Sequence, residues 1–166
     1  MTELIQSAEV GSEEMNKSRL REAISTRRSA TPADARLTRL LRVLVIDDDQ
    51  DTVESMCRLI ALWGHDFRRA YDTLAGLKLA ATYHPDLILL DLGLPLMDGC
   101  RMAREIRLDP RLQSCFIVAV TGYDDDEQRE CCRQAGIDLL LVKPVDAVVL
   151  ETLLELEGYY INRPAK

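Results

Sequence analysis

The chain has 166 residues, of which 47% are hydrophobic and 30% are charged, a mixture typical of one soluble globular domain with a short appendage. No apolar run approaches the roughly 20 residues that span a bilayer, so we expect no membrane span. Residues 1–41 carry six acidic and seven basic side chains, a net charge of +1. Since the whole chain has a net charge of −7, residues 42–166 carry −8. Such an acidic domain is an unsuitable partner for nucleic acid.

Residues 1–41 form a charged N-terminal extension that we expect to be disordered or weakly helical. Ser12 is a suitable N-cap for a helix that continues to residue 25. Its apolar face would consist of Met15, Leu20 and Ile24, which is little apolar surface for stable packing.

From residue 42 onward, short aliphatic runs alternate with stretches of helical periodicity. The predicted strands lie at residues 43–46, 67–70, 87–90, 116–120 and 139–142. The predicted helices lie at residues 53–60, 73–83, 100–107, 125–135 and 149–156. This alternation predicts an α/β fold in which a parallel sheet is covered by helices on both faces. We therefore place the folded domain at residues 42–160, followed by a C-terminal tail at 161–166.

Polar residues follow the predicted strands at their carboxyl ends, where open parallel sheets form their sites. They are Asp47, Asp48 and Asp49 after the first strand, Asp91 after the third, Thr121-Gly122 after the fourth, and Lys143 after the fifth. Clustered carboxylates repel one another unless a cation neutralises them, and oxygen ligands without His or Cys favour Mg²⁺. With a lysine and a hydroxyl beside them, these residues suit a phosphoryl group and offer an aspartate as nucleophile.

Four motifs at these strand ends resemble the receiver domain of two-component response regulators. They are Ile46-Asp47-Asp48-Asp49, the run from Asp91 to Gly99 (DLGLPLMDG), Val120-Thr121-Gly122 and Val142-Lys143-Pro144. The resemblance covers residues 42–160. It implies a flavodoxin-like, doubly wound sheet of five parallel strands in the order 2-1-3-4-5. It also implies a signalling protein that catalyses only its own phosphorylation and dephosphorylation.

The resemblance also assigns a role to each residue of the site. Asp91 is the phospho-acceptor. Asp48 binds Mg²⁺ directly, Asp47 binds it through water, and Asp91 and the backbone carbonyl of Gly93 are further ligands. Thr121 (with Gly122) and Lys143 bind the phosphoryl oxygens, and the Lys143-Pro144 peptide bond is expected to be cis.

Three positions make this chain individual. Leu140 stands where the family usually has Tyr or Phe, three residues before the lysine, so signalling by movement of an aromatic ring is put in doubt. Gly93 has no side chain to cover the site, whereas Tyr123 offers a bulky one. A tyrosine at that place shields a phosphoryl group from water, so we expect slow self-dephosphorylation.

We expect a stand-alone receiver, since only Gly158 to Lys166 follow the final helix. Its phosphodonor would be a sensor histidine kinase or a histidine phosphotransferase. It would act on a downstream protein target as a phosphorelay intermediate, a phosphate sink or a partner regulator. The alternatives are a pseudo-receiver scaffold that works without phosphorylation, and a receiver fragment of a hybrid histidine kinase. A phosphohydrolase is disfavoured because Gly93 occupies the place of the second acid that such an enzyme needs.

The five cysteines are odd in number and show no paired CxxC spacing. We interpret them as reduced core thiols of a cytoplasmic protein rather than as disulfides or a zinc site.

Overall fold

The computed structural model describes residues 2–27, 39–95 and 97–161, and within them the side chains of 11–23, 39–95 and 97–158. The strands are β1 (Arg42–Ile46), β2 (Asp66–Ala70), β3 (Leu87–Asp91), β4 (Phe116–Thr121) and β5 (Leu139–Val142). The helices are α1 (Thr2–Arg27), α2 (Gln50–Leu62), α3 (Thr73–Tyr83), α4 (Gly99–Leu108), the 3₁₀ turn η2 (Pro110–Leu112), α5 (Asp126–Ala135) and α6 (Ala147–Ile161). Residues 162–166 of the predicted C-terminal tail lie outside this part of the chain.

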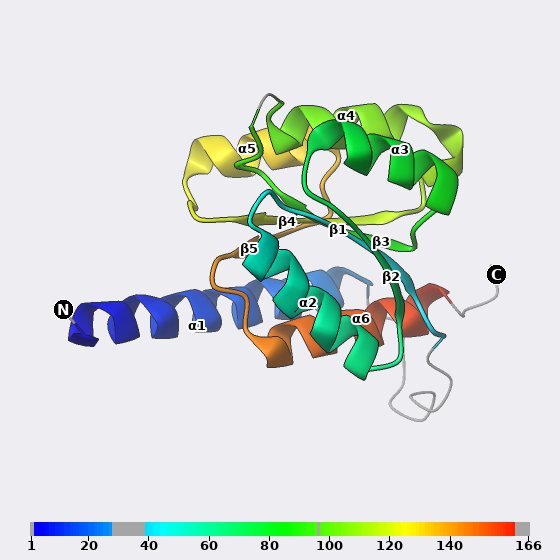
Figure 1. Cartoon of the computed structure of the whole chain (residues 1–166). Helices are drawn as coiled ribbons and strands as arrows, with labels where there is room; N and C mark the ends of the chain where they lie inside the picture. The colour runs from blue at the N-terminus through cyan, green and yellow to red at the C-terminus, as the bar shows by residue number, and fades with distance from the viewer. Residues whose placement is uncertain (1, 28–38, 96, 162–166) are drawn as a thin grey trace.

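The five strands form one parallel sheet in the order β2-β1-β3-β4-β5. Helices α3, α4 and α5 cover one face, and α1, α2 and α6 cover the other (Figure 1). The predicted flavodoxin-like fold and strand order are therefore confirmed. None of the described helices is both long enough and apolar enough to cross a membrane.

Each central strand contributes side chains to two hydrophobic cores. In β1, Leu44 and Ile46 pack toward α3, α4 and α5, while Val43 and Val45 pack toward α2 and α6. All four side chains are at most 1% exposed. Such continuous apolar runs are expected for parallel strands that are covered on both faces.

Aspartates begin the helices that follow the strands. Asp49 caps α2 by accepting hydrogen bonds from the backbone N–H groups of Asp51 and Thr52. Asp98 caps α4 and Asp125 caps α5 in the same way. Each cap satisfies helix N–H groups that have no partner within the helix, and so fixes the direction in which the chain leaves the sheet.

The N-terminal extension contains α1, a helix that packs against β5 and α6 (Figure 1). Its buried face consists of Ser12, Asn16 and Leu20, which are 6%, 0% and 5% exposed. The sequence predicted a different face, with Met15 and Ile24 beside Leu20. Met15 is half-buried, and the side chain of Ile24 lies outside the described residues. Two of the three buried residues are polar, so hydrophobic periodicity does not reveal this face.

Most of the cysteines lie in the core, as the sequence predicted. All five are free thiols, and four of them are buried. Burial raises the pKa of Cys132 to about 11 and that of Cys115 to about 12, which keeps both thiols protonated at neutral pH.

Candidate functional site

Three carboxylates from two adjacent strands meet at the carboxyl edge of the sheet. Asp47 and Asp48 follow β1, and Asp91 is the last residue of β3. Their carboxylate oxygens lie within 4.8 Å of one another. Asp47 is 3% and Asp91 is 6% exposed, whereas Asp48 is open to solvent. The structure therefore brings together the three acidic side chains that the sequence predicted to form one site.

Lys143 reaches these carboxylates from the end of β5. Its Nζ donates a hydrogen bond of 2.7 Å to Asp47 Oδ2 and lies 3.1 Å from Asp91 Oδ1. Its backbone N–H donates to the carbonyl of Thr121 over 2.7 Å, which ties β5 to the end of β4. Burial lowers the pKa of Lys143, but hydrogen bonds to the two carboxylates outweigh this effect and the pKa is raised. The Lys143-Pro144 bond is cis, as expected.

Burial is the main reason why the pKa of Asp91 is raised above its ordinary value. Lys143 opposes the shift, while the nearby charges of Asp47 and Asp48 add to it. A divalent cation would relieve this repulsion, and carboxylate oxygens are the ligands that Mg²⁺ prefers. The donor set therefore fits Mg²⁺.

Two glycines shape the chain beside Asp91. A Cβ on Gly93 would lie 3.2 Å from Asp91 Oδ2, so this oxygen is left uncovered by the absence of a side chain. A Cβ on Gly99 would lie 2.7 Å from the carbonyl oxygen of Asp91, closer than real Cβ contacts. A side chain at Gly99 would therefore displace the backbone that carries Asp91.

Two of the predicted phosphate-binding residues, Thr121 and Gly122, lie at the end of β4. Thr121 is 4% exposed, and its Oγ1 accepts a hydrogen bond of 3.2 Å from the backbone N–H of Tyr123. Gly122 is exposed, with open space where a side chain would be. The Tyr123 side chain is 78% exposed. Leu140 is half-buried and packs against the core on the α3, α4 and α5 side.

The family model described as "Response regulator receiver domain" matches residues 43–155. This chain belongs to the response regulator receiver family. Among curated relatives, it is 36% identical over 104 residues to the transcriptional regulatory protein PrrA of Mycobacterium tuberculosis, which covers 62% of this chain and 43% of PrrA. It is 30% identical over 103 residues to the polar-differentiation response regulator DivK of Brucella abortus, covering 62% of this chain and 84% of DivK. The chain thus spans less than half the length of PrrA.

Solved receiver structures share the fold. A CheY-like response regulator receiver domain protein from Methanospirillum hungatei has a TM-score of 0.65 at 27% identity, covering 74% of this chain and 99% of that one. The chemotaxis response regulator CheY4 of Vibrio cholerae has a TM-score of 0.67 at 22% identity, covering 72% and 99%. The family match begins at residue 43, so α1 lies outside it.

Sequence reasoning missed one polar cluster of this receiver, which lies three residues beyond Thr121. The Asp124 carboxylate forms ion pairs with Arg129 of α5 and with Arg19 of α1, and its side chain is only 8% exposed. Hydrogen bonds from Arg129 and then Arg19 lower the pKa of Asp124 to about 2. The sequence predicted a helix from residue 125 and assigned no role to Asp124. The basic side chains of the extension were the available sign of a partner for it.

Proposed function

We propose that this receiver accepts a phosphoryl group on Asp91 from a phosphohistidine partner in a Mg²⁺-dependent reaction. The observation that carries the proposal is the pairing of a buried Asp91 with Lys143, beside two further carboxylates. One half-buried lysine cannot neutralise three acidic groups, so the site retains negative charge. Such a site is suited to a cation together with the phosphoryl group that the cation helps to hold.

One carboxylate oxygen of Asp91 is paired with Lys143, and the other is accessible. Lys143 Nζ lies against Oδ1, while Oδ2 faces the position where Gly93 lacks a side chain. We assign Oδ2 as the nucleophile. The bond from Oδ2 to phosphorus forms as the phosphorus–nitrogen bond of the phosphohistidine breaks, and the electron pair of that bond remains on the imidazole nitrogen.

The remaining side chains would hold the transferred group. Asp47, Asp48, Asp91 and the carbonyl of Gly93 would bind Mg²⁺, which supplies positive charge to the phosphoryl oxygens. Lys143 would pair with one of these oxygens. The Thr121 hydroxyl accepts a hydrogen bond from Tyr123 N–H, and its own proton can still be donated to another phosphoryl oxygen.

Phosphoramidate tests this proposal, because it contains the same phosphorus–nitrogen bond as phosphohistidine. We expect the full chain, incubated with phosphoramidate and Mg²⁺, to gain one base-labile phosphoryl group in its intact mass. Asp91→Asn should gain none, and EDTA should abolish labelling of the native chain. Asp49→Asn is the matched control, since Asp49 caps α2 from the same loop and should not affect labelling. Equal labelling of the native chain and Asp91→Asn, or none in either, would favour a scaffold that works without phosphorylation.

We further propose that the phosphoryl group on Asp91 is lost slowly, because Tyr123 restricts the approach of water. Its ring is 78% exposed and therefore is not held by packing elsewhere. Tyr123→Ala should accelerate the loss of phosphate from the isolated protein several-fold, measured as the decay of the phosphorylated mass after removal of the donor. An unchanged decay rate would assign the lifetime to other residues.

The partners follow from this chemistry. A histidine kinase or histidine phosphotransferase would supply the phosphoryl group, and a downstream protein would respond to it. We propose that this receiver signals through protein contacts rather than through nucleic acid, since residues 42–166 carry a net charge of −8.

A further inference from the structure

The outer edge of β5 is bound by a side chain of α1. Asn16 is fully buried; its Nδ2 donates to the carbonyl of Val142 and its Oδ1 accepts from the N–H of Val142, both over 2.8 Å. The next residue, Lys143, directs its N–H toward β4. Since successive residues of a strand direct their backbone groups to opposite sides, the N–H and C=O groups of Val142 point away from β4, toward the outer edge of the sheet. Asn16 therefore takes the place of a sixth strand at this residue.

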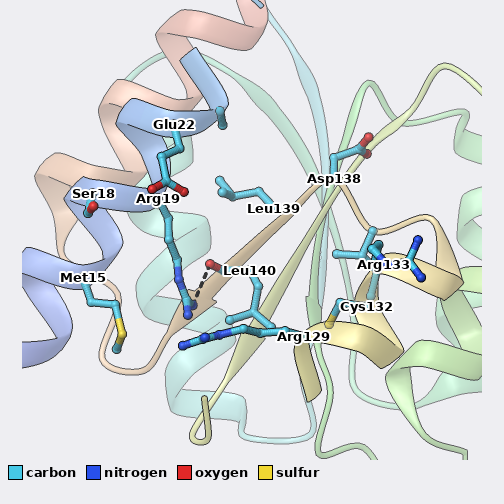
Figure 2. Close-up of a pocket in the computed structure, with 12 residues that line it drawn as sticks. Met15, Ser18, Arg19, Glu22, Arg129, Cys132, Arg133, Asp138, Leu139 and Leu140 are labelled. Carbon is cyan, nitrogen blue, oxygen red and sulfur yellow. Dashed lines mark hydrogen bonds between the residues drawn. The ribbon is translucent and has the colours of Figure 1, made fainter. Parts of the chain in front are cut away.

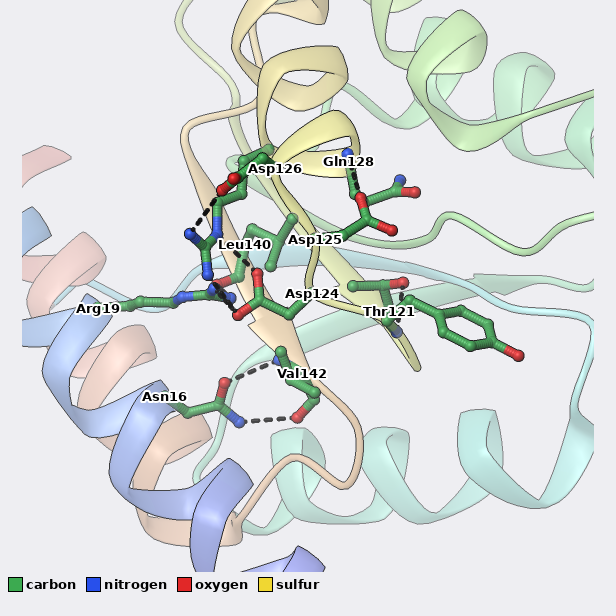
Figure 3. Close-up of polar contacts among 11 residues, drawn as sticks. Asn16, Arg19, Thr121, Asp124, Asp125, Asp126, Gln128, Leu140 and Val142 are labelled. Atoms are coloured by element: carbon green, nitrogen blue, oxygen red, sulfur yellow. Dashed lines mark hydrogen bonds and ion pairs between the residues drawn. The ribbon is translucent and has the colours of Figure 1, made fainter.

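Arg19 makes a second connection one helical turn further along α1. Its Nη1 donates to the carbonyl of Leu140 over 3.1 Å, and its Nη2 pairs with Asp124 (Figures 2 and 3). One side chain thus links α1 both to β5 and to the segment that follows β4.

Both connections lie beside the candidate phosphate site in the sequence. Val142 directly precedes Lys143, whose Nζ contacts Asp91. Asp124 follows Thr121 by three residues, and the hydrogen bond from Tyr123 N–H to Thr121 Oγ1 helps to set the course of the chain between them (Figure 3). A shift of Lys143 or Thr121 therefore moves the nearby chain that carries Val142 and Asp124, to which α1 is bound.

The described part of α1 also borders an open hollow. This hollow of about 570 Å³ separates α1 from α5, lined by residues of α1, α5 and β5 that include Met15, Arg129 and Leu140 (Figure 2). Leu20 is the apolar residue of α1 that is buried among the described side chains. Among the side chains of α1 that the structure describes, Asn16 and Arg19 thus make the hydrogen bonds that join this helix to β5.

We propose that the β5 edge is a helix-binding surface, that α1 is its intramolecular ligand, and that phosphorylation of Asp91 weakens the binding of α1. This inference rests on the proposed function. A phosphoryl group draws the Lys143 ammonium and the Thr121 hydroxyl toward itself, and both movements displace the partners of Asn16 and Arg19. Since coupling between two sites is reciprocal, loosening α1 must also strengthen binding of a phosphoryl group at Asp91, and a typical coupling is about 5- to 150-fold.

Hydrogen exchange of the Val142 amide reports the docking directly, because this N–H donates to Asn16. We expect Asn16→Leu in the full chain to accelerate this exchange at least tenfold, and Ser18→Ala, at an exposed position of α1, to leave it unchanged. Arg19→Ala is the second variant, compared with Arg21→Ala at an exposed arginine of the same helix. Equal exchange in Arg19→Ala and Arg21→Ala, together with unchanged exchange in Asn16→Leu, would overturn the docking of α1.

The coupling is tested with phosphoramidate and Mg²⁺ while intact mass is recorded on the same samples. We expect phosphorylation to accelerate Val142 exchange at least fivefold in the native chain and not in Asp91→Asn. Beryllofluoride, a non-covalent phosphoryl mimic, should bind at least twofold more tightly to Arg19→Ala than to Arg21→Ala. A mass gain with unchanged exchange and equal beryllofluoride affinities would overturn the coupling alone. The absence of any mass gain would overturn the proposed function and the coupling with it.

Discussion

The two edges of the sheet are protected in different ways. The β2 edge carries charged side chains, and Asp66, Arg68 and Arg69 are all exposed. The β5 edge has the sequence Leu-Leu-Leu-Val and is bound by α1. Both arrangements prevent the open edge of a sheet from pairing with another chain. The difference is that the charged side chains belong to β2 itself, whereas α1 is a separate segment that, under the proposed coupling, can dissociate and expose the β5 edge.

Among the substitutions at the two edges, Asn16→Leu should lower the free energy of unfolding the most. It removes both hydrogen bonds to Val142 and leaves two backbone groups without partners at a buried position. Each such group costs about 1–3 kcal/mol, so we expect the free energy of unfolding to fall by about 2–6 kcal/mol. Urea denaturation, with Ser18→Ala as the control, measures the change. A loss no greater than that of the control would show that Asn16 does not stabilise β5.

Arg19→Ala should have a smaller effect at the same edge. It removes one hydrogen bond to a carbonyl and a partly buried ion pair, while Arg129 continues to pair with Asp124. We expect a loss of about 1 kcal/mol in the free energy of unfolding. In a double-mutant cycle with Asp124→Asn, the two losses should add up to more than the loss in the double variant. Strict additivity would mean that the ion pair contributes nothing.

The matched change at the β2 edge should cost less still. Arg69 pairs with Glu54 of α2 over 2.7 Å, but both side chains are more than 40% exposed. Exposed ion pairs are screened by solvent, so Arg69→Ala should change the free energy of unfolding by less than about 0.5 kcal/mol. A loss as large as that of Arg19→Ala would remove the contrast between the two edges.

The smallest effect should be a pH dependence beside the β2 edge. His65 Nδ1 accepts a hydrogen bond of 3.1 Å from the backbone N–H of Leu41, and burial lowers the pKa of His65. The unfolded chain therefore takes up a proton near pH 6.5, about the ordinary histidine value, before the folded chain does. The free energy of unfolding should therefore fall as the pH drops below this value. Above it, His65 is neutral in both states and should not affect stability. Urea midpoints from pH 7.5 to 5 should show a shallower fall in His65→Asn, and identical curves would exclude this role.

The carboxylate site was more predictable from the sequence than the docking of α1 on the β5 edge. The runs before Asp47, Asp91, Thr121 and Lys143 are continuously apolar, so strand positions and their common edge followed from the pattern. The docking of α1 did not, because Asn16 recognises backbone groups of Val142, and backbone groups leave no trace in residue types. The role of Gly99 was equally hidden, since it depends on how closely one backbone passes another.

The polar face of α1 has a consequence for synthesis of the chain. Asn16 and Val142 are 126 residues apart, so α1 is made long before its binding site exists. At about 5–20 residues per second, α1 waits about 6–25 s on the ribosome for β5. An apolar stripe would be exposed to other proteins during that time, whereas Ser12 and Asn16 can remain hydrated. The polar residues that hide the buried face of α1 from hydrophobic periodicity thus also reduce the apolar surface that this face exposes on the nascent chain.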